Sequence, residues 1–296
     1  MGRVFLVYAP GVGANPWLER RVLNYAHQGG AREAPSSTLF ALRHAVAAGA
    51  DALELDVHAS SDGVVMVCHD ATVDRTTATS GAIAQLSYDE LRTLDNAYWW
   101  VPGEVVAHDR DAADYVHRGK APGDAAFGIA TLRDVLTEFA GVFLNLDIKQ
   151  TAPTVAPYEH LVADLLREFG RSDDVIVASF DDRATDAFSA IAPDVSTSCG
   201  TVVTAAVWQA VRDDAPLPAT RHHALQVPAA AGGNVIVDAR FVTRAHEHGL
   251  AVHVWTIDDP AEMERLIDLG VDGVMTDRPS ALEAVLQRRG VAYSGQ

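Results

Sequence analysis

Short β-branched runs alternate with Ala- and Leu-rich stretches along most of this chain, and this alternation constrains its fold more than any other feature. Nine runs have the length and composition of β-strands: residues 22–27, 52–57, 64–68, 142–148, 175–179, 195–199, 224–227, 251–257 and 273–276. Eight stretches have helical composition: residues 38–48, 132–139, 158–169, 183–191, 202–211, 239–248, 262–269 and 280–288. Strands that alternate with helices predict a parallel sheet covered by helices.

One of the nine runs does not fit this alternation. Only six residues, which include Asp62 and Gly63, separate Val57 from Val64. So short a connection cannot contain a crossover helix, so we expect residues 64–68 to fold back as a hairpin arm. The remaining eight units predict a (β/α)₈ TIM barrel of the α/β class. An open doubly wound sheet is disfavoured, because no Gly-x-Gly-x-x-Gly turn follows any early strand.

The domain organisation follows from this pattern. Residues 22–290 are predicted to form the barrel, and residues 1–21 are a Pro- and Gly-containing lead-in. Residues 71–127 contain no clean strand–helix unit and are longer than an ordinary connection, so they predict an insertion subdomain after the second strand and its hairpin. The aromatic residues Tyr98, Trp99 and Trp100 could form either the core of this insertion or an apolar ramp at the barrel mouth.

The charge and hydropathy of the chain limit its partners and location. Forty acidic residues against 23 basic ones give a net charge of −17, which predicts no binding to nucleic acid. No stretch approaches the roughly 18 apolar residues of a membrane span, so we expect no stable membrane insertion. The apolar run near the N-terminus is broken at Pro10, too early for a secretory signal, so the predicted location is cytoplasmic. The oligomeric state is left open.

Carboxylates alternate with apolar residues on two of the predicted strands. Glu54 and Asp56 share one face of their strand, and the intervening leucines and valine share the other. In a (β/α)₈ barrel the apolar face meets the helices, so both acids are expected to point inward near the carboxyl end of the strand. The same parity directs Asp147 and Lys149 inward from a later strand, and His253 and Trp255 from another.

Glu54, Asp56 and Asp147 are therefore expected to lie close together inside the barrel. Three buried carboxylates repel one another and lose solvation unless a cation joins them. Hard oxygen ligands of this kind suit Mg²⁺ or Ca²⁺, so the predicted cofactor is one divalent cation.

Two histidines complete this constellation. His27 ends the first predicted strand before Gly29 and Gly30, and His69 ends the hairpin arm. A histidine pair beside a cation suits phosphodiester cleavage, in which one ring takes a proton from the nucleophile and the other protonates the leaving alkoxide. His58 shares the parity of the acids on its strand and is a weaker candidate for a supporting role.

The order of these motifs resembles the glycerophosphodiester phosphodiesterase family over about residues 22–285. The resemblance lies in His27-Gln28-Gly29, Pro35 to Thr38, Glu54-Leu55-Asp56, Asp62-Gly63, His69-Asp70 with Arg75-Thr76, Asp147-Ile148-Lys149, Ser179-Phe180, Trp255-Thr256 and Thr276-Asp277. It implies that His27 and His69 are the general acid/base pair and that Glu54, Asp56 and Asp147 hold the metal. It also implies that Lys149 contacts phosphate and that Trp255 lines the glycerol or head-group pocket.

The chain departs from the family pattern at three places. Gln28 stands where the family usually has an arginine, so a phosphate contact there would be a neutral hydrogen bond instead of a charged, bidentate one. Ser36 and Ser37 replace a usual Glu-Asn pair, and Asp147 replaces a longer glutamate. These changes could weaken phosphate binding or alter the preferred substrate.

The resemblance predicts an enzyme that hydrolyses glycerophosphodiesters to sn-glycerol 3-phosphate and an alcohol with the help of a divalent cation. One alternative is lysophospholipase D-type hydrolysis of lysophospholipids on the same site. The other is a barrel that binds phosphodiesters without cleaving them, although binding alone does not require a proton-transfer pair. The sequence leaves open the alcohol and the choice between Mg²⁺ and Ca²⁺.

Overall fold

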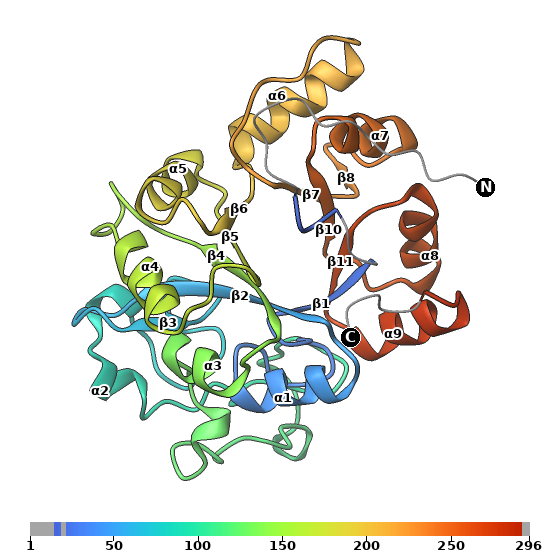
Figure 1. Cartoon of the computed structure of the whole chain (residues 1–296). Helices are drawn as coiled ribbons and strands as arrows, with labels where there is room; N and C mark the ends of the chain where they lie inside the picture. Colours follow the sequence, from blue (N-terminus) through green and yellow to red (C-terminus); the bar gives the residue numbers. More distant parts are fainter. Residues whose placement is uncertain (1–14, 19–21, 292–296) are drawn as a thin grey trace.

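The computed structural model of the chain describes residues 15–18 and 22–291. Eight parallel strands occupy the centre of the molecule, and helices surround them (Figure 1). These strands are β1 (Leu23–His27), β2 (Ala52–Ala59), β4 (Phe143–Ile148), β5 (Val175–Ala178), β6 (Ser196–Thr197), β7 (Ala224–Pro228), β10 (Ala251–Trp255) and β11 (Gly273–Thr276). Most of the predicted lead-in, residues 1–21, lies outside the described residues.

The strands form a nearly closed barrel. Hydrogen-bonded neighbours follow the order β6-β5-β4-β2-β1-β11-β10-β7. A parallel bridge between Ser198 and Ala224 then joins the two ends of this path. Consecutive strands are linked by helices, except around the hairpin arm, so the predicted (β/α)₈ fold is confirmed.

Several of the outer helices begin at a residue whose side chain caps them. They are α1 (Leu39–Ala47), α3 (Leu132–Glu138), α4 (Glu159–Glu168), α5 (Asp182–Ile191), α6 (Thr201–Arg212), α7 (Ala239–Glu247), α8 (Pro260–Leu269) and α9 (Pro279–Arg288). Thr38, Thr131 and Asp238 each accept a hydrogen bond from a backbone N–H of the first turn that follows. Such caps satisfy donors that have no partner within the helix, which fixes where each helix starts.

The predicted run at residues 64–68, which did not fit the alternation, forms the expected hairpin arm. It is β3 (Val65–Val67), which pairs antiparallel with the end of β2, so that Val57 lies opposite Val67. This arm runs back along β2 from Ala59 to Val57, and His69 follows it at the cavity.

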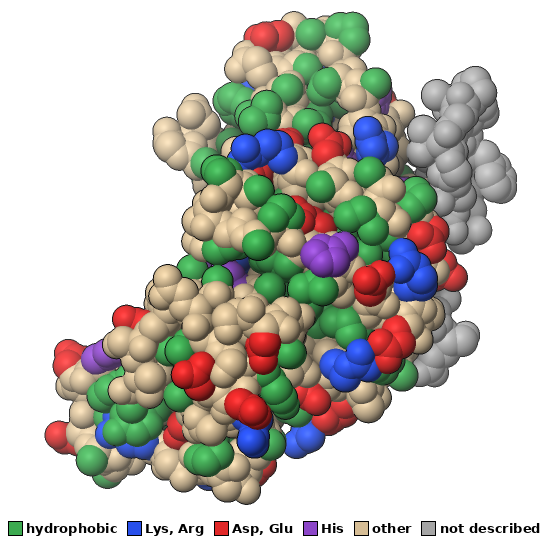
Figure 2. Space-filling view, turned by 90° about the vertical axis from the view of Figure 1, so that its left-hand side faces the viewer, with side chains coloured by type: hydrophobic (Ala, Val, Ile, Leu, Met, Phe, Trp, Pro, Cys, Tyr) green, Lys and Arg blue, Asp and Glu red, His purple; other side chains and the backbone are tan. Residues whose placement is uncertain are grey.

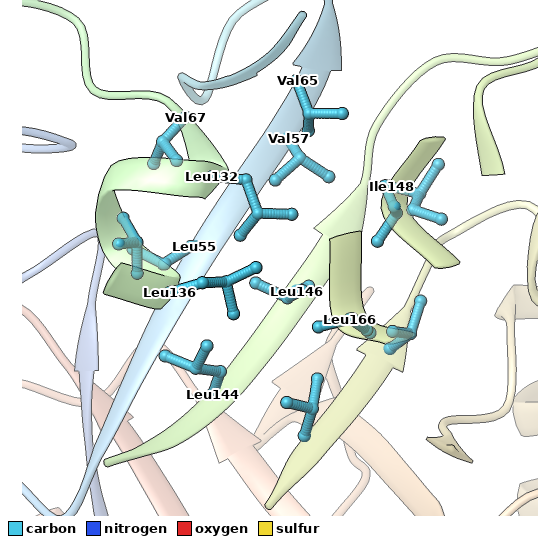
Figure 3. Packing of buried hydrophobic residues seen from close by; sticks show 14 of the residues in the cluster. Leu55, Val57, Val65, Val67, Leu132, Leu136, Leu144, Leu146, Ile148 and Leu166 are labelled. Carbon is cyan, nitrogen blue, oxygen red and sulfur yellow. The ribbon is translucent and has the colours of Figure 1, made fainter. Parts of the chain in front are cut away.

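Side-chain alternation separates the outer from the inner face of the barrel wall. The outward residues of β2 and β4 pack against α3 and α4 in one apolar layer, which includes Leu55, Val57, Leu132, Leu136, Leu144, Leu146, Ile148 and Leu166 (Figure 3). Because these positions alternate with Glu54, Asp56, Asn145 and Asp147, the polar residues lie on the inner face.

The amino ends of the strands are closed by a separate cluster of large side chains. Trp17 is fully buried there with Tyr25, and the Asn15 amide donates to the carbonyl oxygens of His223 and Gly249. Gly273 permits this packing, because a Cβ at that position would lie 2.7 Å from the Tyr25 ring. This end of the barrel is a packed core, so the polar inner residues open only toward the other end.

Residues 71–127 hold short elements and no barrel strand. These are η1 (Ile83–Gln85), α2 (Tyr88–Leu91), η2 (Ala112–Asp114) and η3 (Ala125–Phe127). Trp100 is buried and donates from Nε1 to the Ala31 carbonyl at 2.9 Å, and Trp99 donates to the Thr77 carbonyl at 2.8 Å. Trp99 and Trp100 are therefore held by hydrogen bonds within this segment and to the loop after β1, and none of Tyr98, Trp99 and Trp100 lines the cavity described below.

A small hairpin between β7 and α7 was not predicted. It consists of β8 (Ala230–Ala231) and β9 (Asn234–Val235), each of two residues, joined by Gly232 and Gly233 at positive φ. Its strands are too short to give a pattern in the sequence.

Candidate active site

A cavity of about 530 Å³ lies at the carboxyl ends of the strands. Seven of the eight predicted site residues line it: His27, Glu54, Asp56, His69, Asp147, Lys149 and Trp255. The exception is Gln28, which is only 5% exposed and is not part of the cavity wall. Strand alternation therefore identified the inner residues, and the barrel brings them to the end where such folds place their active sites.

The carboxylates from β2 and β4 meet at a single lysine. Lys149 Nζ lies 2.7 Å from Asp56 Oδ1 and 2.8 Å from Asp147 Oδ2, with both acids almost fully buried. Burial would lower the pKa of Lys149, but the two carboxylates outweigh it and raise that pKa above its usual range. Burial also raises the pKa of Asp147, although the lysine opposes this effect.

Glu54 is the third acid of this cluster and lies next to the turn after β1. Burial and the nearby charge of Asp56 raise the pKa of Glu54 to about 8. Its Oε2 accepts the backbone N–H of Gln28 at 3.1 Å. Gln28 adopts a φ of +51°, which is uncommon for a residue with a side chain, and Gly29 and Gly30 continue the left-handed turn. This turn directs the backbone N–H of Gln28 toward Glu54.

A carboxylate from the last strand orients His27. Nδ1 of His27 lies 2.7 Å from Asp277 Oδ1, and since a carboxylate only accepts hydrogen bonds, Nδ1 must carry the proton. Nε2 is left near the cavity, 3.9 Å from Glu54 Oε2 and 3.4 Å from the Gln28 amide nitrogen. Burial alone would lower the pKa of His27, but Glu54 and Asp277 raise it to about 9.

His69 is oriented in the same way from the hairpin arm. Its Nδ1 lies 2.6 Å from Asp70 Oδ1, and Arg75 Nε donates to the other oxygen of Asp70 at 2.6 Å. These two hydrogen bonds hold the pKa of Asp70 well below its usual range, so the carboxylate stays ionised. His108 of the insertion donates to the Arg75 carbonyl at 3.1 Å and stacks on Trp99.

His58 lies behind His69 and does not line the cavity. Its Nε2 is 3.3 Å from the His69 carbonyl oxygen, and burial lowers its pKa. A neutral ring with Nε2 as donor fits this contact, so His58 supports the backbone at His69.

The donor chemistry of the acid cluster fits a hard divalent cation. Asp56 Oδ2 and Asp147 Oδ1 are buried and accept no hydrogen bond from the described residues. These oxygens give Asp56 and Asp147 a capacity to bind a cation that the contacts with Lys149 do not use. Within residues 15–18 and 22–291 no three acidic, His or Cys side chains are already arranged as a coordination group, and the Lys149 ammonium lies between two of the acids. A cation at this position would compete with that ammonium.

Sequence reasoning missed two parts of the site. Asp277 lies in one of the sequence motifs, but its role could not be predicted, because its contact with His27 spans 250 positions and depends on the barrel being closed. Sequence reasoning also missed the wall made by Phe180, α6 and the β8–β9 hairpin, which follow β5, β6 and β7. The signal in the sequence that could have identified these segments is their position directly after a strand end.

A barrel with this arrangement of acids and paired histidines belongs to the class of phosphoric diester hydrolases, and comparison with known proteins identifies the family. The sequence model of the glycerophosphoryl diester phosphodiesterase family matches residues 27–281. The chain belongs to this family, so the predicted membership, fold and enzyme class are confirmed.

Relatives and solved structures agree with this membership. A glycerophosphodiester phosphodiesterase of Caldanaerobacter subterraneus is 28% identical over 278 residues, which cover 91% of this chain and 100% of the relative. A phosphodiesterase of Oleispira antarctica, solved with the product sn-glycerol-3-phosphate, has a TM-score of 0.70 at 23% identity, with 89% of this chain and 96% of that one covered. A glycerophosphodiester phosphodiesterase of Agrobacterium tumefaciens has a TM-score of 0.65 at 23% identity, with 88% and 98% covered.

The described part of the chain has no helix that is both long and apolar enough to cross a membrane.

Proposed function

We propose that this chain hydrolyses glycerophosphodiesters to sn-glycerol 3-phosphate and an alcohol, with His27 and His69 as the proton-transfer pair. One observation carries the assignment: two histidines line the same cavity, and each is held at Nδ1 by its own carboxylate. Because a carboxylate holds Nδ1 of each ring, Nε2 is free to take or give a proton at a defined position. Family membership and the acid cluster between these rings support the same reaction.

The remaining residues bind and orient the phosphate. Lys149 supplies a positive charge at the base of the cavity, where a phosphodiester anion would otherwise meet three acids. Asp277 and Asp70 keep the two rings in one tautomer, so that neither ring needs to reorient before it transfers a proton. Gln28 acts through Glu54 and the His27 ring, since it contacts both of these residues and does not line the cavity.

We also propose that Glu54, Asp56 and Asp147 hold one divalent cation, Mg²⁺ or Ca²⁺. The buried, unpaired oxygens of Asp56 and Asp147 support this assignment. When bound, such a cation neutralises charge on the phosphoryl oxygens. Asp147 is one methylene shorter than a glutamate, so a water molecule in the coordination shell would compensate for the shorter reach.

The test is the release of glycerol 3-phosphate from glycerophosphocholine by the purified protein with Mg²⁺, with Ca²⁺ and with EDTA. We expect release with at least one cation and none with EDTA. Calorimetric titration of the same cation should show weaker binding to Asp147→Asn than to the wild type. Full activity in EDTA would disprove the metal assignment. Binding of glycerol 3-phosphate without turnover under any of these conditions would replace hydrolysis with a binding function.

A further inference from the structure

The carboxylate that orients His27 is itself held by a second acid, Asp258, in the loop after β10. The backbone N–H of Ile257 donates to the Met275 carbonyl at 2.9 Å, which continues the pairing of β10 with β11 beyond the end of β10. Because β11 lies between β10 and β1, this pairing sets Asp258 beside the residues that face His27 (Figure 1). Neither Asp258 nor Asp277 lines the cavity.

One oxygen of Asp258 fixes the backbone at Asp277. Its Oδ1 accepts the backbone N–H of Asp277 at 2.9 Å and the hydroxyl of Thr276, a fully buried residue, at 3.0 Å. The backbone carbonyl of Asp277 is held as well, because it accepts the N–H of Arg32 at 3.2 Å. Both polar groups of this backbone unit are therefore fixed from neighbouring loops, and the direction of the Asp277 side chain toward His27 depends on them.

The other oxygen of Asp258 contacts Arg32, which lies in the loop after β1. Arg32 Nε donates to Asp258 Oδ2 at 2.8 Å, and the two side chains are 37% and 24% exposed. The insertion supports this arginine: Gly103 donates its N–H to the Arg32 carbonyl at 3.0 Å, and the Gly103 carbonyl accepts from Arg32 Nη1 at 3.2 Å. Arg32 thus joins the loops after β1, β10 and β11 to the insertion.

An ion pair between an arginine and an acid is by itself common on this molecule. On the face shown in Figure 2, basic side chains lie beside acidic ones at several places, and such exposed pairs contribute little to stability. The pair of Arg32 and Asp258 differs, because each of its members also binds the backbone of Asp277. These hydrogen bonds converge on the residue whose carboxylate holds the His27 ring at 2.7 Å.

The other histidine of the cavity has a similar support. Arg75 donates directly to Asp70, the carboxylate at Nδ1 of His69. At His27 the arginine acts through an additional carboxylate. Side chains that react are usually held by such outer contacts, because small displacements slow the reaction.

We propose that Asp258 and Arg32 are positioning residues for His27 and act on it through Asp277. The proposal rests on the proposed hydrolysis, in which His27 transfers a proton. Neither Asp258 nor Arg32 lines the cavity, so neither contacts the substrate or the reacting atoms. Their loss should therefore lower kcat and leave KM nearly unchanged, whereas loss of a residue that binds the substrate would alter KM.

The experiment measures kcat and KM for release of glycerol 3-phosphate from glycerophosphocholine, with the cation that supports turnover. Asp258→Leu removes every acceptor of this side chain and should lower kcat by roughly tenfold to thirtyfold. Asp258→Asn and Arg32→Met each remove only the ionic contact, since an amide oxygen can still accept from Asp277 and Thr276. Both should lower kcat by about threefold, so the asparagine restores most of the activity that the leucine loses.

A double-mutant cycle tests the route through Asp277. In an Asp277→Asn background, Asp258→Leu should lower kcat further by less than about twofold, because the carboxylate that it positions is already lost. Arg265→Met is the matched control, since it removes an arginine that pairs with Glu262 within α8. This control should keep the wild-type kcat and KM.

Three results would overturn the positioning role: wild-type kcat in Asp258→Leu, a loss carried by KM alone, or losses that multiply in the double variant. Circular dichroism shows whether Asp258→Leu folds. If it does not, Asp258→Asn and Arg32→Met decide instead: a loss of kcat that disappears in the Asp277→Asn background supports the role, and an unchanged kcat in both overturns it.

A measurement without turnover separates this proposal from the proposed function. If the wild type cleaves no diester, the hydrolysis fails, and NMR spectroscopy of the His27 ring decides the positioning. The nitrogen shifts of this ring, assigned by their loss in His27→Ala, report how strongly Nδ1 is hydrogen-bonded. A change of these shifts in Asp258→Leu and in Arg32→Met, but not in Arg265→Met, supports the proposal, and unchanged shifts overturn it.

Discussion

The two sides of the barrel interior have opposite effects on a buried histidine. On the side of β1, β2 and β4, the carboxylates of Glu54 and Asp277 overcome the effect of burial and raise the pKa of His27 to about 9. On the side of β7 and β10, His253 has only the weak influence of Asp272, and burial lowers its pKa to about 4. The same side chain is therefore favoured as a cation on one side and as a neutral ring on the other.

This difference shows that charge is distributed unevenly over the inner face of the barrel. The charged side carries the residues that we propose for proton transfer and for binding a cation. The neutral side holds Gln226 and Trp255, which shape the cavity without adding charge. Gln226 donates to Asn145 at 2.6 Å across the interior, so the boundary between the two sides is itself a neutral hydrogen bond.

The largest effect is expected on the charged side. His27→Ala and His69→Ala should each lower kcat by about a thousandfold, because each removes one of the two proton-transfer groups. Steady-state kinetics on glycerophosphocholine measure this change. His160→Ala is the matched control, since His160 is exposed on α4 and should leave kcat unchanged. Unaltered turnover in both cavity variants would remove the proton-transfer assignment.

The inner face of the barrel was predictable because the strands that form it are long enough to alternate. Glu54 and Asp56 could be assigned to the interior from their neighbours alone, and the turn length before Val64 identified the hairpin arm. These are local properties, and they do not depend on how the barrel closes.

The rest of the site depends on closure and on loop geometry. Asp277 reaches His27 only because β11 lies beside β1. The direction of the Gln28 side chain follows from a φ of +51°, which the sequence does not specify. Part of the cavity wall comes from α6 and from the β8–β9 hairpin, and neither shows a pattern in the sequence that separates cavity residues from core residues.

The next effect concerns the residue that orients His27. Asp277→Asn should lower kcat by about a hundredfold with a smaller change in KM, because an amide no longer fixes the tautomer of the ring. Loss of the carboxylate also removes one cause of the raised pKa of His27, so the alkaline limb of the kcat profile should move to lower pH. Asp89→Asn, at an 82% exposed side chain, should change neither quantity. A fall in KM alone would contradict an orienting role.

The buried His253 on the neutral side leads to a prediction about how the stability of the folded protein depends on pH. The folded protein keeps His253 neutral down to about pH 4, whereas the unfolded chain binds the proton near 6.5. The unfolded state therefore binds more protons between these values, so stability falls as the pH falls through this window. His253 should account for a loss of about 2 kcal/mol between pH 7 and pH 5.

Denaturant unfolding of the wild type and of His253→Gln at both pH values measures this loss. Glutamine carries no charge at either pH, so the loss of stability on acidification should be smaller in the variant by about 2 kcal/mol. Equal losses in the two proteins would mean that the ring is protonated in the folded state, and the contrast between the two sides of the barrel would then disappear.

The smallest effect is expected where the insertion supports the charged side. His108→Phe preserves a ring that can stack on Trp99 but removes the hydrogen bond to the Arg75 carbonyl. Arg75 keeps its contacts with Asp70, and the region is partly exposed, so kcat should fall by about threefold or less. Arg75→Met should cause a larger loss, because it removes the hydrogen bonds from Arg75 to Asp70 and leaves the contact with His69 without that support. If His108→Phe lowers kcat as much as Arg75→Met, the insertion positions His69 directly, and the charged side would depend on residues well outside the barrel strands.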